Sequence, residues 1–333
     1  MLEAVSPPVG LVTPSRSGRR PRVLLVDDHR QVLDTVSAML SGEFEVAGAA
    51  TSGAEAVEIA HQVKPDAIVL DVNMPGVDGF QTCRVLESSG FANTPIVFLS
   101  MHDGDEIVGE AFRCGGRGYV LKTRVGNDLA SAITHALGGR VFVPSLSSLL
   151  RLATGATHAM QLHDEVESFV DDVAALFDLA LRRGDATCVI ATRQIREGIG
   201  DRLRARGWDV GGSSGHKRYL TVDAADALNR FMRNGLPDPN LLAEIAVELD
   251  QYRRAVCDGP GSRLTVFGNM VMALHAAGNT RAMIALEREW NRMTHGLPIL
   301  TLCGYGSPCF HDSPGLWADA CAEHWAVSHA RHL

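Results

Sequence analysis

The sequence predicts an α/β protein in which a five-stranded, doubly wound parallel sheet is followed by a second α/β domain. Short runs rich in Val, Ile and Leu alternate with amphipathic stretches along most of the 333 residues. In the first half, five strand–helix units fit into about 120 residues, which is typical of a doubly wound sheet. Polar residues follow several of the apolar runs, at the strand ends where such sheets bind ligands.

The alternation places five strands and five helices in the first half of the chain. The strands are expected at 23–28, 44–50, 67–71, 96–100 and 118–122. The helices are expected at about 30–41, 53–63, 80–88, 104–114 and 126–138. Residues 1–21 come before them, and their content of Pro, Ser, Gly and Arg predicts a disordered tail. Residues 22–140 then form the first domain.

Residues 141–156 are expected to be a linker, and the second domain is expected at 157–330. One strand is expected to end near residue 162, and further strands are expected at 187–192, 219–222, 264–267 and 299–302. Helices are expected at 166–180, 195–206, 224–233, 241–256, 270–277 and 280–294. The last segment, 311–333, is also expected to be helical.

Composition excludes several classes of protein. The net charge is -8 and the pI is about 5.9, which disfavours a nucleic-acid partner. No apolar run reaches the ~18 residues of a membrane-spanning helix, and the proline-rich N-terminus does not resemble a secretory signal. The seven cysteines are dispersed, with no Cys-x-x-Cys pair, which predicts reduced thiols and a cytoplasmic location.

Acidic residues at two strand ends predict a site for a divalent cation. Asp27 and Asp28 follow the first strand, and Asp71 ends the third. Three neighbouring carboxylates repel one another, and hard oxygen ligands of this kind suit Mg²⁺. The turn after Asp71 is expected to offer the backbone carbonyl of Asn73 as a further ligand. Ser100 and Lys122, at the ends of the fourth and fifth strands, add a hydroxyl and a compact ammonium.

The phrases VLLVDD, DVNMPGVDG, VFLS and GYVLK, in this order and spacing, resemble the receiver domain of two-component response regulators. The resemblance covers about residues 22–140. It implies that a histidine kinase phosphorylates Asp71 while Mg²⁺ is bound by the three aspartates. It also implies that Ser100 and Lys122 contact the phosphoryl group. Tyr119 matches the aromatic residue that changes rotamer on activation.

The second half resembles the MEDS family, the methanogen/methylotroph DcmR sensory domain, which is thought to be a divergent relative of RecA/KaiC-like ATPases. The resemblance rests on phrases such as LRRGDATCVIAT and RLTVFGNMVMALHAAGNTRAMIALEREWNRM. A glutamate is expected after Gly268, but Asn269 stands there and cannot act as a carboxylate base. No G-x-x-x-x-G-K-[ST] phosphate loop is present, so we expect no ATPase activity. We expect the chain to accept a phosphoryl group and to catalyse no other reaction. Arg193 and Arg196 could meet an anion at a helix start, although arginines there are usually solvated.

A late group of cysteines and histidines lacks the tightly paired spacing of zinc motifs. It comprises Cys303, Cys309, His311, Cys321 and His324. We interpret these residues as buried thiols and ordinary histidines. The glycine-rich segment 211–218 is interpreted as a flexible surface loop.

The sequence therefore predicts a response regulator whose second domain binds an unidentified output protein or small-molecule ligand. The other expected partner is the cognate histidine kinase. We expect no interaction with a membrane, and a homodimer is possible. The alternative is a phosphorylation-controlled transcription regulator. It rests on THALGGRVFVPS, which resembles the end of receivers in LuxR-type regulators, and requires an unrecognised DNA-binding output.

Overall fold

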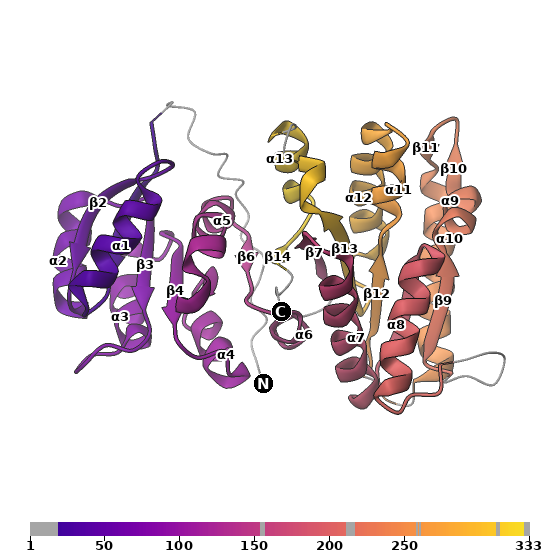
Figure 1. The fold of residues 1–333 in the computed structure, drawn as a ribbon, viewed down its shortest axis with the longest axis horizontal. Coiled ribbons are helices and arrows are strands. Elements are labelled where there is room, and N and C mark those ends of the chain that lie inside the picture. Colours follow the sequence, from indigo (N-terminus) through magenta and orange to yellow (C-terminus); the bar gives the residue numbers. More distant parts are fainter. Residues whose placement is uncertain are drawn as a thin grey trace. The chain divides into compact units, whose positions relative to one another are not determined.

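The computed structural model describes residues 19–153, 157–210, 217–257, 259, 261–310 and 314–329. The chain divides into two compact units, residues 1–144 and 145–333. In each unit, helices flank parallel strands, as Figure 1 shows, and the predicted α/β class is confirmed. Among the described residues, no helix is both long and apolar enough to cross a membrane.

The strands of the first unit are parallel and lie in the order β2-β1-β3-β4-β5-β6. They are β1 (Arg22–Val26), β2 (Glu45–Ala50), β3 (Ala67–Asp71), β4 (Ile96–Ser100), β5 (Gly118–Leu121) and β6 (Val141–Phe142). The helices are α1 (Arg30–Leu40), α2 (Gly53–Val63), α3 (Gly79–Leu86), α4 (Asp105–Arg113) and α5 (Val125–Leu137), with short turns at Glu87–Phe91 and Lys122–Arg124. Strands β3 and β4 are buried along their whole length, because α1 packs beside α5 and α2 beside α3 over the sheet.

The main strands of the second unit are also parallel, in the order β14-β7-β13-β12-β8-β9. They are β7 (Thr157–His163), β8 (Ala186–Ala191), β9 (Tyr219–Asp223), β12 (Leu264–Gly268), β13 (Ile299–Gly306) and β14 (Ala326–His329). The helices are α6 (Leu146–Leu152), α7 (Val166–Arg182), α8 (Arg193–Ala205), α9 (Ala224–Phe231), α10 (Pro239–Val256), α11 (Met270–Ala276), α12 (Thr280–Thr294) and α13 (Pro314–Ala322), with a short turn at Ser307–Phe310. A small hairpin joins β10 (Met232–Arg233) to β11 (Leu236–Pro237). The RecA/KaiC-like classification of this unit stays a prediction.

Two segments differ from what the sequence predicts. The expected linker, 141–156, contains β6 and α6, because Phe142 and Leu149 are buried rather than exposed. The segment 311–333, expected to be helical, contains α13 followed by the strand β14, in which Ala326 and Val327 are fully buried. Four residues are too few to show a periodicity, so pairing with β7 decides the conformation there. Most of the expected tail, residues 1–18, lies outside the described residues.

Candidate functional site

Four polar side chains follow four neighbouring strands of the first unit at one edge of its sheet. β1 pairs with β3, β3 with β4 and β4 with β5, all in parallel. The register places Asp71 opposite Leu99, so Ser100 is the next residue along β4. Asp27 and Lys122 directly follow the last residues of β1 and β5. The strand pairing thus brings together residues that are far apart in the sequence.

Lys122 lies between two buried carboxylates. Its Nζ is 2.7 Å from Oδ2 of Asp27 and 2.9 Å from Oδ2 of Asp71. Burial raises the pKa of Asp71 and the charge of Asp27 raises it further, although the hydrogen bond from Lys122 opposes both. Burial lowers the pKa of Lys122, but its bonds to the two carboxylates outweigh this effect and raise that pKa. One ammonium shared by two carboxylates leaves a negative charge, so the site attracts a further cation.

Asp28 completes a set of oxygen donors that fits Mg²⁺. Acidic or imidazole atoms of Asp27, Asp28 and His29 lie within 4.8 Å of one another. His29 precedes α1 without a side-chain capping bond, its side chain is 70% exposed, and its Nδ1 lies 2.9 Å from Oδ1 of Asp28. Asn73 donates its backbone N–H to Oδ1 of Asp71 at 3.2 Å. Carboxylate oxygens are the ligands that Mg²⁺ prefers, and the pocket already accommodates an ammonium between two of them. The carbonyl role of Asn73 stays a prediction.

Ser100 and Tyr119 are linked through the backbone of His102, in the loop after β4. The Ser100 hydroxyl accepts a hydrogen bond from the His102 N–H at 3.1 Å, and the Tyr119 hydroxyl donates to the His102 carbonyl at 2.6 Å. Ser100 and Tyr119 are both fully buried. The hydroxyl groups of Ser100 and Tyr119 therefore both bind the same residue of this loop.

The loop after β3 is fixed by a helix cap and by a close backbone contact. Asp78 caps α3 by accepting a hydrogen bond from the Gln81 N–H at 2.7 Å, as a loop-shaping residue should. Gly79 donates its N–H to the Val72 carbonyl at 2.9 Å. A Cβ at position 79 would lie 2.2 Å from the carbonyl oxygen of Asp71. Only glycine fits here without moving the backbone of Asp71.

Gly79→Ala should therefore lower the free energy of unfolding by about 1–3 kcal/mol, because a backbone atom cannot rotate away as a side chain can. Denaturant unfolding of the full chain measures the change. Gly109→Ala is the matched control, since a Cβ at position 109 within α4 would meet open space and alanine favours a helix. Equal stabilities of the two variants would contradict the steric argument.

The four candidates of the second unit lie at neighbouring strand ends, and both arginines among them pair with acids. Gly268 ends β12, and the buried Asn269 follows it with no hydrogen-bond partner for its Oδ1 among the described residues. Arg193 is 82% exposed and pairs with an acid one turn later at 2.7 Å. Arg196 pairs with Asp223 at 2.7 Å. Both arginines are already neutralised, which agrees with the interpretation that they are ordinary helix residues.

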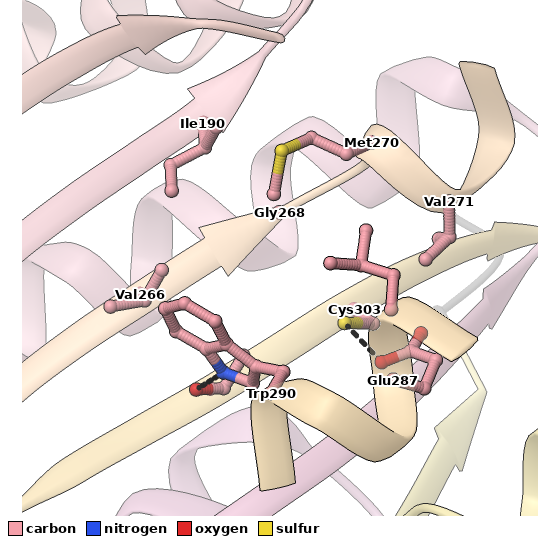
Figure 2. Close-up of a pocket in the computed structure, with 10 residues that line it drawn as sticks. Ile190, Val266, Gly268, Met270, Val271, Glu287, Trp290 and Cys303 are labelled. Carbon is pink, nitrogen blue, oxygen red and sulfur yellow. Dashed lines mark hydrogen bonds between the residues drawn. The ribbon is translucent and has the colours of Figure 1, made fainter. Parts of the chain in front are cut away.

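Two cavities adjoin these strand ends. The smaller has a volume of about 30 Å³, and Figure 2 shows Glu287 and Cys303 facing each other among the residues that line it. The larger has a volume of about 260 Å³ and is lined mainly by apolar side chains of β9, α9 and α10. Ile190, Met270 and Trp290 line both. The Trp290 indole donates a hydrogen bond to the Thr301 hydroxyl at 2.8 Å, which fixes the ring between the two cavities.

A buried polar cluster that the sequence did not predict lies next to the smaller cavity. It consists of His158, Glu287, Cys303 and His324. Cys303 and His324 were singled out, but with partners close in sequence rather than with His158. No sequence signal marks His158, because it lies 145 residues from Cys303. His311 and the segment 211–216 lie outside the described residues.

Comparison with known families assigns both halves of the chain. The response regulator receiver domain matches residues 23–134. The MEDS domain, or methanogen/methylotroph, DcmR sensory domain, matches residues 157–324.

Comparison with individual proteins finds relatives that match part of the chain. This chain is 34% identical over 126 residues to the transcriptional regulatory protein MctR of Rhizobium johnstonii, and the match covers 37% of this chain and 58% of that protein. It is 32% identical over 143 residues to the nitrate/nitrite response regulator protein NarL of Escherichia coli, covering 40% and 65%. The chain thus spans less than two thirds of the length of these relatives. Among solved structures, the signal receiver domain of NarL from Mycobacterium tuberculosis is 32% identical, covers 34% of this chain and 97% of that one, and has a TM-score of 0.32.

Proposed function

Because the chain belongs to the MEDS family and carries a response regulator receiver domain, we propose that it is phosphorylated on Asp71 by a histidine kinase and signals through its MEDS domain. One observation carries this proposal. Asp71 lies buried at a strand end, where it shares the ammonium of Lys122 with Asp27. A carboxylate held against a cation, beside a second acid and a buried hydroxyl, suits phosphoryl acceptance.

In the proposed reaction, an oxygen of Asp71 forms a bond to phosphorus while the P–N bond of the donor phosphohistidine breaks. The histidine nitrogen leaves with the bonding electron pair. Asp27, Asp28, Asp71 and the Asn73 carbonyl would hold Mg²⁺, which when bound neutralises charge on the phosphoryl oxygens. Lys122 pairs with the new phosphoryl group, which adds about 1.5 to 2 negative charges.

The signal would leave the site through the loop after β4. The Ser100 hydroxyl would turn toward the phosphoryl oxygens. It would then lose the hydrogen bond that it accepts from the His102 N–H in the structure. Since Tyr119 holds the carbonyl of the same residue, its ring and this loop move together. The output surface of the receiver is therefore the face around residues 100–125, as for other switches that couple a new charge to a loop.

The MEDS domain would bind a small ligand or a protein. The cavity of about 260 Å³ supports a small, largely apolar ligand, because apolar cavities of ~150 Å³ already accept molecules as large as benzene. Arg230 and Glu248 are the charged residues among those that line it, and they pair with each other at 2.8 Å. Their paired charges leave the apolar wall as the main recognition surface.

A transcription regulator is the second candidate, because relatives such as MctR are named as transcriptional regulatory proteins. The arginine-rich helix α8 does not support it. Its four arginines each pair with an acid within the second unit, and so offer little charge to DNA phosphates. Salt-dependent binding of duplex DNA by the full chain would revive this candidate.

We also propose that the chain hydrolyses no nucleotide. The sequence lacks a phosphate loop, and the neutral Asn269 stands where a catalytic carboxylate is expected. The arginines at the start of α8 are engaged by acids. The activity proposed for the chain is thus restricted to accepting and losing a phosphoryl group.

Hydrogen exchange of the full chain tests this function. Addition of beryllofluoride and Mg²⁺, which together mimic a phosphorylated aspartate, should change the protection of the loop that contains His102 and of the start of α4. The change should require both reagents and should be absent in Asp71→Asn. Identical exchange with and without the mimic would count against a receiver that signals through this loop.

A further inference from the structure

Four side chains with metal-binding atoms converge in the interior of the second unit. Their binding atoms all lie within 4.8 Å of one another, and each residue is at most 7% exposed. Nε2 of His158 is 3.1 Å from Sγ of Cys303 and 3.1 Å from Oε2 of Glu287. Nε2 of His324 is 3.6 Å from Oε1 of Glu287. Figure 2 shows Glu287 and Cys303 directed toward each other.

The fold brings these residues together from four separate segments. β7 and β13 pair in parallel with His158 opposite Thr301, so Cys303, two residues later, points to the same face of the sheet. α12 packs on that face and places Glu287 within 3.5 Å of the Cys303 sulfur. His324 lies between α13 and β14, and β14 is the other neighbour of β7. The cluster therefore depends on the folded domain rather than on any sequence motif.

Hydrogen bonds on the far side of both rings fix which nitrogen carries the proton. Nδ2 of Asn291 donates to the Glu323 carbonyl at 2.6 Å, so its side-chain oxygen must face Nδ1 of His158 at 2.8 Å. Nδ1 of His324 is 2.7 Å from the carbonyl oxygen of Ala320. Both partners only accept hydrogen bonds, so each Nδ1 carries a hydrogen. In a neutral ring, Nε2 then presents its lone pair to the cluster.

The cluster consequently holds electron-pair donors that need a cation. A lone pair 3.1 Å from a carboxylate oxygen is repulsive unless a proton or a metal ion lies between them. Protonating both rings would leave two cations beside the single carboxylate of Glu287, which is an uncompensated positive charge in a buried site. Tyr305 donates a hydrogen bond to Oε1 of Glu287 and so orients the carboxylate. Histidine ligands with a hydrogen-bonded Nδ1, and carboxylate ligands with an orienting donor, are typical of metal centres.

We propose that His158, Glu287, Cys303 and His324 bind one transition-metal ion of the zinc class. Two imidazole nitrogens, a thiolate and a carboxylate are the donors that Zn²⁺ takes in tetrahedral sites, where ligand atoms stand about 3.3–3.8 Å apart. In the structure, two separations, 3.5 and 3.6 Å, lie within this range, and the two that involve Nε2 of His158, both 3.1 Å, are about 0.2 Å shorter than its lower limit. The adjoining cavity of about 30 Å³ has room for about one water-sized additional ligand. This site is separate from the receiver and does not depend on phosphorylation of Asp71.

Cobalt substitution of the full chain tests the site. The chain is stripped of metal with a chelator and titrated with Co²⁺ in excess Mg²⁺, so that the oxygen site of the receiver is occupied. We expect one equivalent to bind, with a thiolate-to-metal charge-transfer band and visible bands of tetrahedral intensity. Zn²⁺ should displace the colour. No thiolate band in the wild-type chain would overturn the proposal, and this measurement needs no variant to fold.

Variants assign the ligands. Cys303→Ser should lose the thiolate band, whereas Cys188→Ser, which alters a buried thiol on β8 outside the cluster, should keep it. Asn291→Ala should weaken metal binding about 10–100-fold by freeing the His158 ring, while leaving the band in place. A band that persists in Cys303→Ser would refute this ligand set. If Cys303→Ser does not fold, His324→Gln, judged by the loss of one-equivalent binding, serves instead.

Discussion

Replacing Asp71 with asparagine should reduce phosphorylation of the full chain by acetyl phosphate to background. An amide cannot form an acyl phosphate. Among the described residues, the carboxylates paired with Lys122 are those of Asp71 and Asp27, and Asp71 is the one that matches the acceptor position of receiver domains. Intact-mass spectrometry in the presence of Mg²⁺ measures the label. Removal of Mg²⁺ should prevent labelling of the wild-type chain as well, because the phosphoryl oxygens then meet an uncompensated acidic pocket.

Asp78→Asn provides the matched control for this experiment. Asp78 is half-buried and caps α3, a role that asparagine also fills, so labelling should stay at the wild-type level. Full labelling of Asp71→Asn would show that another residue accepts the phosphoryl group. Loss of labelling in both variants would point to a damaged loop rather than to a missing acceptor.

Lys122→Met should lower the free energy of unfolding by about 3–5 kcal/mol at neutral pH without Mg²⁺, because two buried carboxylates lose the cation that they share. Denaturant unfolding measures this loss. Mg²⁺ should stabilise Lys122→Met more than it stabilises the wild-type chain, since the metal ion is then the remaining counter-charge. Asp27→Asn should act in the opposite direction and stabilise the unphosphorylated chain, because it leaves one lysine for one carboxylate.

The loss in Lys122→Met should also depend on pH. The pKa of Asp71 is already raised in the folded wild-type chain, and without the lysine it rises further. A carboxyl group whose folded pKa is raised binds its proton more tightly in the folded state. The loss should therefore be small below the unfolded pKa of about 3.9 and grow as pH rises through the folded pKa. A pH-independent difference between the two proteins would contradict the electrostatic explanation.

The receiver site could be predicted from the sequence because each of its residues directly follows or ends a short apolar run. In parallel sheets, consecutive strand ends meet at one edge, so the positions of Asp27, Asp71, Ser100 and Lys122 follow from local pattern and topology alone. The hydrogen bond from the Tyr119 hydroxyl to the His102 carbonyl could not be predicted, because the partner of a hydroxyl depends on the orientation of its side chain.

The polar cluster of the second unit could not be predicted for a different reason. Its residues come from two strands, a helix and a loop, and β7 lies next to β13 although many elements separate them in the chain. No periodicity or motif reports such a neighbour relationship. The strand β14 escaped prediction likewise, since its four residues gain their conformation from pairing with β7.

If Asp71 carries the proposed phosphoryl group, the burial of this residue beside Lys122 should also affect how fast that group is lost. An acyl phosphate is hydrolysed when a water molecule attacks phosphorus from the side opposite the aspartyl oxygen. A side chain that blocks access of water to that side slows the hydrolysis. The same packing around Asp71 should thus set the half-life of the proposed phosphorylated state.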